Sequence, residues 1–347
     1  MTEEVRGIDP ARVSAWLAAN LDGARPPFRF ELIAAGGSNL TYRVVDSGGR
    51  AFALRRPPVA ARIATAHDMA REWKIIGALS RPLSPVPAPA ALAFCDDEAV
   101  NGAPFYVMSF VEGLILRDSA QAAALSAEQK ERATDALIAT QAALHTLDVD
   151  AVGLGDLARK RVGYVERQLA RWRTQAEASA AREIPLLARV HARLARSIPR
   201  EIARSALAHG DYRFDNVVLD AQQRVIAVLD WELCTIGDPI ADFCWSLVYW
   251  AAPGELNTWL QDPPTQAPGF CTRAEVSKRY AERTGFDLSQ LAYYEVFSWW
   301  KMACLVEGVA ARARAGASGG MRSGSVADIV ARADRYFARA DELSRGL

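Results

Sequence analysis

The side chains best suited to catalysis lie near the middle of the chain, where residues 209–216 run His-Gly-Asp-Tyr-Arg-Phe-Asp-Asn. Phosphoryl transfer needs an Asp that accepts the proton of an attacking hydroxyl and an Asn five residues later that holds a magnesium ion. Asp211 and Asn216 have this spacing, and Asp230 follows as a second metal ligand on a separate element. The sequence therefore predicts a phosphoryl-transfer centre, with Asp211 as the catalytic base.

Two short apolar runs must position these residues. Val217 to Asp220 and Val225 to Leu229 are rich in β-branched residues and are joined by a polar turn, which predicts a hairpin. Such a hairpin would bring Asn216 and Asp230 to one metal ion. The alternative is a surface loop with an Asx turn before a strand, because carboxylates are common near turns. The downstream segment Gly-Asp-Pro-Ile-Ala-Asp-Phe at 237–243 favours the catalytic interpretation.

With these motifs the chain resembles the aminoglycoside phosphotransferase family of kinase-like small-molecule phosphotransferases, and most closely the branch sometimes fused to acyl-CoA dehydrogenases. The resemblance covers nearly the whole chain and is most specific at the central motif. It implies an α+β, protein-kinase-like fold with a small antiparallel-sheet lobe at residues 1–108, a hinge at 109–113 and a mainly helical lobe at 114–347. A helical insert is expected at about 153–205. ATP and Mg²⁺ are the cofactors that the resemblance implies.

Composition narrows the class of partner. The 347 residues include 41 basic and 41 acidic side chains, so no net charge favours nucleic acid or a membrane surface. The five scattered cysteines indicate neither a disulfide framework nor a zinc site. No signal-peptide pattern and no apolar run of membrane-spanning length occurs. We expect a cytoplasmic protein with a small-molecule partner, whose oligomeric state stays open.

The first hundred residues have the pattern of a nucleotide-binding lobe. Strand-like runs at 28–33, 40–45 and 51–55 predict a three-stranded meander. Its tip between the first two strands could present backbone N–H groups to phosphates, because glycine allows close approach. The alternative is an ordinary hairpin loop. The tip residues proposed for phosphate binding are Gly36, Gly37, Ser38 and Asn39.

Arg55 lies where kinases carry a strand lysine that binds phosphates and pairs with a helix glutamate. This replacement departs from the kinase pattern, although a guanidinium fork can also grip phosphate. The helical run at 67–79 contains Glu72, the expected ion-pair partner. Neighbouring Arg56 is expected to be a surface residue at the end of the strand.

Two further strand-like runs, at 90–95 and 104–110, complete the predicted sheet. The second leads into a segment that resembles the hinge of the family. Backbone groups of Ser109, Phe110 and Val111 would bind the adenine edge, and Met108 would stand behind the base.

The rest of the chain is predicted to be mainly helical. Helical patterns begin at Ser126 and recur at 153–205, 240–250, 273–284, 288–313 and 326–343. His145 is expected to be structural. Asp238 is expected to cap the helix that comes after it, and Asp242 to brace the backbone of the catalytic loop.

The acceptor is the least defined part of the prediction. Residues 153–205 carry twelve basic and five acidic side chains, which favours a carboxylate or a phosphate-bearing handle such as coenzyme A. The branch resemblance points to a hydroxyacyl-CoA or related hydroxy acid. The alternatives are an aminoglycoside or other amino alcohol, and a nucleotide-binding scaffold without catalysis. No Ala-Pro-Glu activation segment occurs after the central motif, which disfavours a protein kinase. The candidate acceptor-binding residues are Tyr164, Arg167, Arg171, Trp172 and Glu232.

Overall fold

The structure is a computed structural model that describes residues 5–35, 39–59, 68–82, 84–200, 205–255, 262–316 and 325–347. The described residues divide into two compact units. The first contains the chain up to Gly113 together with Ile226–Glu232, and the second contains the remainder. An antiparallel sheet in the first unit and a mainly helical second unit confirm the α+β class.

The sheet of the first unit has five strands in the order β1-β2-β3-β5-β4, and every neighbouring pair is antiparallel. The first three strands form the predicted meander, in which Thr41 pairs with Arg55. In the third strand, Phe52 to Arg56 are all buried, so both faces of this strand are covered, because successive side chains point to opposite faces. The bounds are β1 Arg29–Ala35, β2 Leu40–Val45, β3 Ala51–Arg56, β4 Ala91–Cys95 and β5 Phe105–Ser109.

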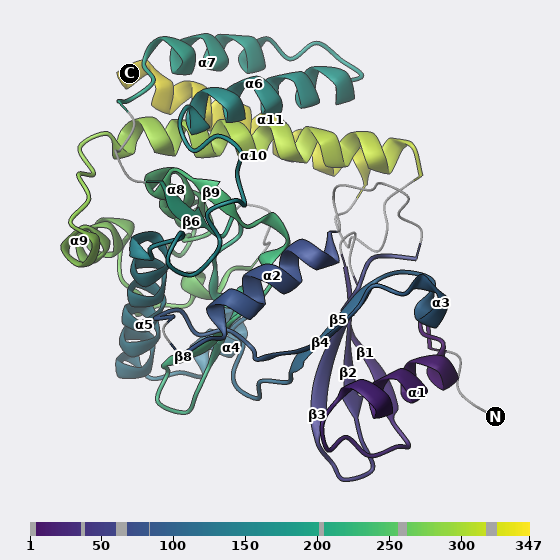
Figure 1. Ribbon diagram of the computed structural model, residues 1–347. Helices are drawn as coiled ribbons and strands as arrows, with labels where there is room; N and C mark the ends of the chain where they lie inside the picture. The colour runs from purple at the N-terminus through teal and green to yellow at the C-terminus, as the bar shows by residue number, and fades with distance from the viewer. Residues whose placement is uncertain are drawn as a thin grey trace. The chain divides into compact units, whose positions relative to one another are not determined.

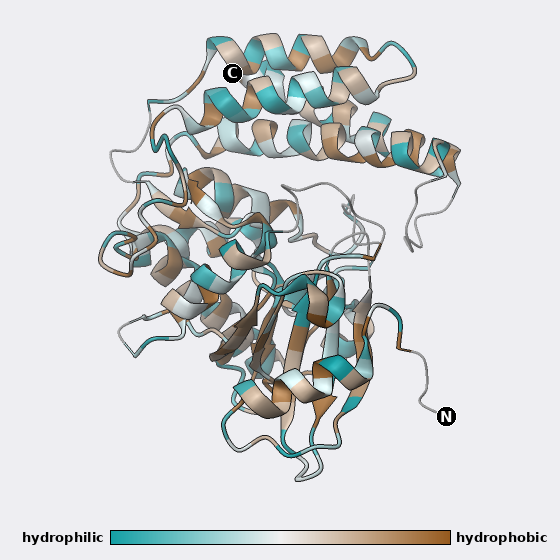
Figure 2. Ribbon diagram, turned by 45° about the vertical axis from the view of Figure 1, so that its right-hand side comes forward, coloured by the Kyte–Doolittle hydropathy of each residue, from teal (hydrophilic) through white to brown (hydrophobic). Residues whose placement is uncertain are grey.

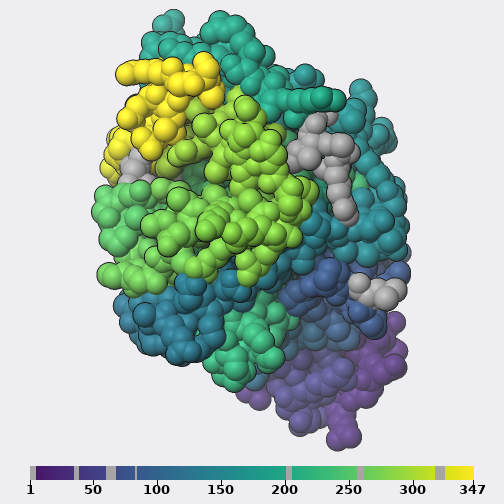
Figure 3. All heavy atoms as spheres, turned by 90° about the vertical axis from the view of Figure 1, so that its left-hand side faces the viewer, coloured from purple at the N-terminus to yellow at the C-terminus, as the bar shows by residue number. Residues whose placement is uncertain are grey.

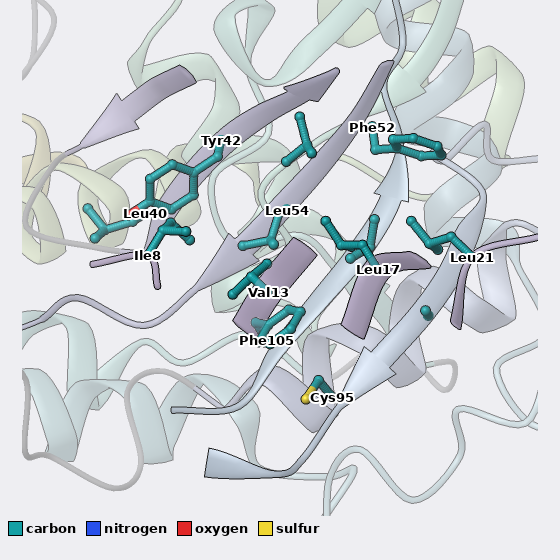
Figure 4. Close-up of a cluster of buried hydrophobic side chains, with 13 residues drawn as sticks. Ile8, Val13, Leu17, Leu21, Leu40, Tyr42, Phe52, Leu54, Cys95 and Phe105 are labelled. Atoms are coloured by element: carbon teal, nitrogen blue, oxygen red, sulfur yellow. The ribbon is translucent and has the colours of Figure 1, made fainter. Parts of the chain in front are cut away.

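Helix α1, Pro10–Asn20, shares a core with this sheet. Asp9 caps its first turn by accepting from the backbone N–H of Arg12, and Pro10 occupies the first helical position, which needs no N–H donor. Figure 4 shows the shared core, in which α1 residues meet side chains from several strands. Its labelled residues are Ile8, Val13, Leu17, Leu21, Leu40, Tyr42, Phe52, Leu54, Cys95 and Phe105.

The prediction of a surface Arg56 is wrong. Its side chain is buried, and its guanidinium donates hydrogen bonds to the backbone carbonyls of Gly7 and Asn101. Asn101 ends a short helix, α3 (Glu98–Asn101), that the sequence analysis did not predict. Carbonyls from two distant segments satisfy the guanidinium, so Arg56 is a structural residue.

The second unit contains eight helices among the described residues, and Figure 1 labels them. Helix α5 begins with a capping box, in which Ser126 and Gln129 satisfy each other's backbone N–H groups. Figure 2 shows hydrophobic and hydrophilic residues mixed along these helices. The bounds are α4 Ser119–Ala123, α5 Ala127–Thr146, α6 Tyr164–Ser179, α7 Pro185–Arg196, α8 Pro239–Val248, α9 Arg273–Thr284, α10 Leu291–Arg314 and α11 Val326–Leu343.

Helix α10 is the central element of the helical unit. It contacts α6, α7, α8 and α11, and Figure 3 shows the neighbouring α10 and α11 in light green and yellow. Because neighbours cover it on several sides, Trp299 and Trp300 are both core residues. No helix of the described ranges is long and apolar enough to cross a membrane.

Of the short strands near the central motif, two were predicted and two were not. Strands form at both apolar runs, as β7 (Val217–Leu219) and β8 (Val225–Val228). The turn between them closes where the N–H of Asp220 donates to the carbonyl of Arg224. Two strands were not predicted: β6 (Ala206–Ala208) and β9 (Thr235–Gly237) pair antiparallel on either side of the motif.

The structure corrects the charge argument for residues 153–205. Several of their arginines pair with acids that lie elsewhere in the second unit. Arg189 and Arg193 both contact Asp341 on α11, at 2.8 and 2.9 Å, and Arg182 contacts the buried Glu307 on α10 at 3.1 Å. These pairs neutralise part of the formal positive excess of the segment, so the excess does not by itself describe an acceptor site.

Candidate functional site

The catalytic loop begins directly after β6, where the backbone makes a turn that only glycine accommodates easily. Gly210 has φ +86°, and a Cβ atom there would lie 2.8 Å from the Cβ of Leu233 and 3.0 Å from its carbonyl oxygen. An L side chain would be strained in this conformation and would also collide with the chain. The Gly of the central motif is thus required by backbone geometry.

Asp242, in the first turn of α8, braces this loop. Its Oδ2 accepts from the N–H of His209 at 2.9 Å, and its Oδ1 accepts from the N–H of Gly210 at 2.8 Å. The Nε2 of His145 donates to the same carboxylate at 3.0 Å, while its Nδ1 accepts from the hydroxyl of Tyr280 at 2.6 Å. Burial alone would raise the pKa of Asp242, but these donors outweigh it and lower the pKa. Both the brace and the structural role of His145 are confirmed.

Asp211 is held from two sides. The side-chain amide of Asn216 donates to the carbonyl oxygen of Asp211 at 2.7 Å and to its Oδ2 at 3.0 Å. The Nε of Arg213 lies 3.1 Å from Oδ1 of the same carboxylate. Because the amide nitrogen of Asn216 is used in this way, its oxygen is the atom left for a cation. The carboxylate keeps about a fifth of its surface exposed, so an acceptor can reach it.

Arg213 links Asp211 to a second carboxylate and to an aromatic ring. Its Nη1 lies 2.9 Å from Asp215, and its guanidinium carbon lies 5.0 Å from the centre of the Tyr249 ring. Burial raises the pKa of Asp215 to about 6, against the lowering effect of Arg213. Burial and the carboxylate of Asp211 raise the pKa of the Tyr249 phenol. Arg213 therefore holds the Asp211 carboxylate within a packed charged cluster.

Arg55 is the centre of an ion cluster in the first unit. Its Nε lies 2.9 Å from Glu72, the predicted partner on α2 (Met69–Leu79), and this ion pair is confirmed. Its Nη2 lies 2.5 Å from Asp230 and 3.3 Å from Glu232. Burial alone would lower the pKa of Arg55, but Asp230 and Glu72 outweigh it and raise the pKa. One planar guanidinium bridges three carboxylates here, which the single ammonium of a lysine would do less well.

Glu72 is fixed by neutral donors as well. Tyr106 donates to it from β5 at 2.9 Å, and the side-chain amide of Asn39 donates to it at 2.6 Å. Burial raises the pKa of the Glu72 carboxyl, against the opposing effect of Arg55. Asn39 thus has a structural bond to the cluster. The other predicted tip residues, Gly36, Gly37 and Ser38, lie outside the described residues.

The donor set suits a divalent cation that also binds phosphate oxygens. The three carboxylates around Arg55 leave two negative charges uncompensated by that guanidinium. Asp230 has φ +62°, a backbone conformation rare for residues other than glycine and often found at functional sites. No group of three His, Cys, Asp or Glu side chains in the described ranges could hold a metal alone. Mg²⁺ typically takes one or two carboxylates plus substrate phosphates, so the residues fit this ion.

The predicted adenine-binding segment is partly engaged within the sheet. The N–H of Ser109 donates to the carbonyl of Ala90, and its hydroxyl accepts from the N–H of Ala90. Phe110 and Val111 lie just after the end of β5 and are only partly buried. Met108 is buried in β5. The backbone of Phe110 and Val111 is therefore better suited to meet a base than the amide of Ser109.

The predicted acceptor residues on α6 have different surroundings. Arg167 donates to backbone carbonyls of its own loop, at Lys160 and Val162, so its guanidinium is engaged locally. Tyr164 packs against Gly237, where a Cβ atom would lie 2.7 Å from the ring. Arg171 and Trp172 lie together, with the guanidinium carbon 5.9 Å from the ring centre. Glu232 belongs to the Arg55 cluster of the first unit.

Three residues of the second-unit site were not singled out by the sequence analysis: Arg213, Tyr249 and Lys301. Arg213 lies inside the motif, and its position two residues after Asp211 was a usable signal. Tyr249 and Lys301 carry no motif of their own. Only packing of α8 and α10 brings their side chains toward the catalytic loop.

Comparisons with known proteins agree with this geometry. A sequence model described as the phosphotransferase enzyme family matches residues 29–294. The chain is 34% identical over 285 residues to acyl-CoA dehydrogenase family member 11 of Gallus gallus, a match that covers 80% of this chain and 36% of that protein. It is 32% identical over 287 residues to acyl-CoA dehydrogenase family member 10 of Mus musculus, covering 81% and 26%. The chain thus spans about a third or less of the length of these two curated relatives.

A solved structure is similar over its whole length. It is a protein of Ralstonia eutropha whose assignment as an aminoglycoside phosphotransferase is provisional. The identity is 30% and the TM-score 0.81, and the match covers 97% of this chain and 98% of that one. This likeness and the family match confirm the kinase-like fold.

Proposed function

This chain belongs to the phosphotransferase enzyme family, and we propose that it transfers the γ-phosphoryl group of ATP to the hydroxyl of a small molecule. The reaction would use Mg²⁺. The acceptor would be a small hydroxyacyl-CoA or related hydroxy acid. The observation that carries the catalytic part is the loop held by Asp242, in which Asn216 and Arg213 orient Asp211. Catalysis of this reaction depends mainly on positioning and charge neutralisation, so few residues are needed.

Each residue would have a separate task. Asp211 would orient the acceptor hydroxyl and accept its proton as the oxygen attacks phosphorus. Asn216 and Asp230 would hold Mg²⁺, which neutralises phosphate charge. Arg55, fixed by Glu72, would contact the phosphates, and backbone groups at Phe110 and Val111 would meet the adenine edge. Residues 109–113 would serve as the hinge between the nucleotide lobe and the lobe that carries the catalytic loop.

The proposed acceptor class is supported by the names of the curated relatives. Two curated relatives are named as acyl-CoA dehydrogenase family members, and the part that matches this chain is a minority of their length. A phosphotransferase joined to an enzyme named for acyl-CoA would act on a related thioester or acid. An aminoglycoside acceptor is the alternative, supported by the provisional name of the Ralstonia eutropha structure.

The test is a direct competition between acceptor classes. The protein would be incubated with ATP and Mg²⁺ and either 3-hydroxybutyryl-CoA, 3-hydroxybutyrate or kanamycin. ADP release and the mass of the product would be measured. We expect phosphorylation of a hydroxyacyl acceptor and little reaction with kanamycin. Turnover of kanamycin alone would establish the alternative, and nucleotide binding without turnover of any acceptor would favour a non-catalytic scaffold.

A further inference from the structure

One lysine in the second unit is surrounded in an unusual way. Lys301 lies on α10 and is partly buried, with its Nζ 3.8 Å from the centre of the Trp245 ring and 5.8 Å from that of Trp172. Among the described residues its contacts are these two rings, and the carboxylates of Asp242 and Asp211 act on its charge from beyond contact distance. Cation–π contact stabilises an ammonium group but does not provide the acceptor atoms that it normally binds.

A second donor at the same ring also lacks a partner. The indole N–H of Trp245 is buried, and no acceptor for it lies within the described part of the chain. A buried donor without an acceptor costs free energy comparable to a lost hydrogen bond. Within the described part of the chain, two donors at one indole thus lack an acceptor, which an anionic or oxygen-rich ligand would supply.

This site is connected to the catalytic loop through side chains of the same unit. Trp245 contacts Tyr249 edge to face, with ring centres 5.9 Å apart. Tyr249 in turn lies under the guanidinium of Arg213, which holds Asp211. The charges are also coupled directly. Burial lowers the pKa of Lys301 to about 8, while Asp242 and Asp211 act to raise it and Arg171 acts to lower it.

We propose that Lys301, with Trp172 and Trp245, forms an anion-binding subsite that receives the carboxylate or phosphate end of the acceptor and so determines acceptor specificity. This inference rests on the proposed function and identifies the residues that recognise its acceptor. Both Lys301 and Trp172 are partly exposed. Arg171, beside Trp172, adds a second positive charge at the rim of the subsite.

The test compares charged and neutral acceptors. Steady-state kinetics would be measured for wild type, Lys301→Met and Lys301→Arg with 3-hydroxybutyryl-CoA, 3-hydroxybutyrate and the uncharged thioester of 3-hydroxybutyrate with N-acetylcysteamine. For Lys301→Met we expect KM to rise roughly 10- to 100-fold with the anionic acceptors, while kcat and the KM of the neutral thioester change little. Lys301→Arg should restore most of the affinity. The comparison of the acid with the CoA thioester shows which anion the subsite binds.

A control and a binding measurement separate this inference from the proposed function. Lys278→Met removes an exposed lysine on α9 and should leave all KM values unchanged. Turnover with equal KM values in wild type and Lys301→Met would overturn the subsite and leave the function intact. If wild type turns over no acceptor, calorimetric titration of wild type and Lys301→Met with coenzyme A and with 3-hydroxybutyrate tests whether the subsite binds anions. Binding that Lys301→Met weakens supports the subsite, and no binding, or equal binding, overturns it.

Discussion

At the level of single residues, one charged side chain in each unit carries the proposed chemistry. Asp211 is a partly buried carboxylate whose position depends on Asn216 and Arg213. Arg55 is a buried guanidinium that bridges Glu72, Asp230 and Glu232. The first is suited to handle the proton of an acceptor, and the second to bind phosphate.

Asp211→Asn should abolish transfer while leaving nucleotide binding nearly unchanged. The amide keeps the shape of the side chain but cannot accept a proton, and loss of such a group costs on the order of 100- to 10,000-fold in rate. Single-turnover kinetics and titration with Mg-ATP measure the two effects separately. Asp220→Asn, which changes a carboxylate in the nearby turn, serves as the control. Retention of most of the turnover by Asp211→Asn would show that another group is the base.

Arg55→Ala should weaken ATP at least 10-fold more than adenosine. Only ATP carries phosphates, and hydrogen bonds from a guanidinium to phosphate are among the strong ones in proteins. The variant also leaves Glu72 buried without its cation, so its unfolding must be measured alongside. Arg55→Lys keeps the charge and should lose less affinity. Equal losses for ATP and adenosine would point to a folding defect instead of a lost phosphate contact.

At the scale of elements, the segments on either side of the catalytic loop determine its shape. β6 leads into the loop, the left-handed conformation of Gly210 turns it, and the first turn of α8 binds its backbone through Asp242. Asp238 caps the same helix by accepting from two backbone N–H groups, as its place before Pro239 predicts. A helix that is capped and packed in this way is a rigid support for the loop.

Asp242→Asn should lower kcat roughly 10- to 100-fold with a smaller effect on KM for ATP. Its carboxylate accepts from three donors, and an amide nitrogen would face one of them without an acceptor. Asp242 does not touch the substrates in this mechanism, so it is a positioning residue. Ser246→Ala, one turn further along α8, is the matched control. An unchanged kcat in Asp242→Asn would mean that the loop holds its shape without the brace.

At the scale of the whole molecule, the chain has no net charge but distributes its charges unevenly. Of the 41 basic residues, 36 are arginines, and Arg182, Arg189 and Arg193 bind acids on the C-terminal helices. Asp341 on α11 receives both Arg189 and Arg193 from α7. This network joins segments about 150 residues apart, so it supports the helical unit more than it steers a ligand.

Asp341→Ala should lower the free energy of unfolding by roughly 1–2 kcal/mol without changing kcat, because hydrogen bonds to charged groups of this kind are worth that much. Chemical denaturation measures the loss. Glu342→Ala removes a neighbouring exposed carboxylate that pairs only with Arg339 among the described residues, and it should change stability by no more than about 0.5 kcal/mol. Equal effects of the two substitutions would argue against a special role for the α7–α11 network.

Features that depend on residues close together in the chain could be predicted from the amino-acid sequence alone. The spacing of Asp211, Asn216 and Asp230, the strand pattern around Arg55 and the caps of the helices are all legible along the chain, since each depends on neighbours within a few residues. The pairing of Arg55 with Glu72 was also predictable, because kinases carry an ion pair between the corresponding strand and helix.

Which distant side chains come together could be seen only in the folded molecule. Buried Arg56 donates to two remote carbonyls, and Arg182 and Arg193 pair with acids on α10 and α11. Lys301 meets Trp172 and Trp245 because α6, α8 and α10 pack together. These contacts depend on how helices far apart in sequence are packed, and no periodicity within one helix encodes its neighbours.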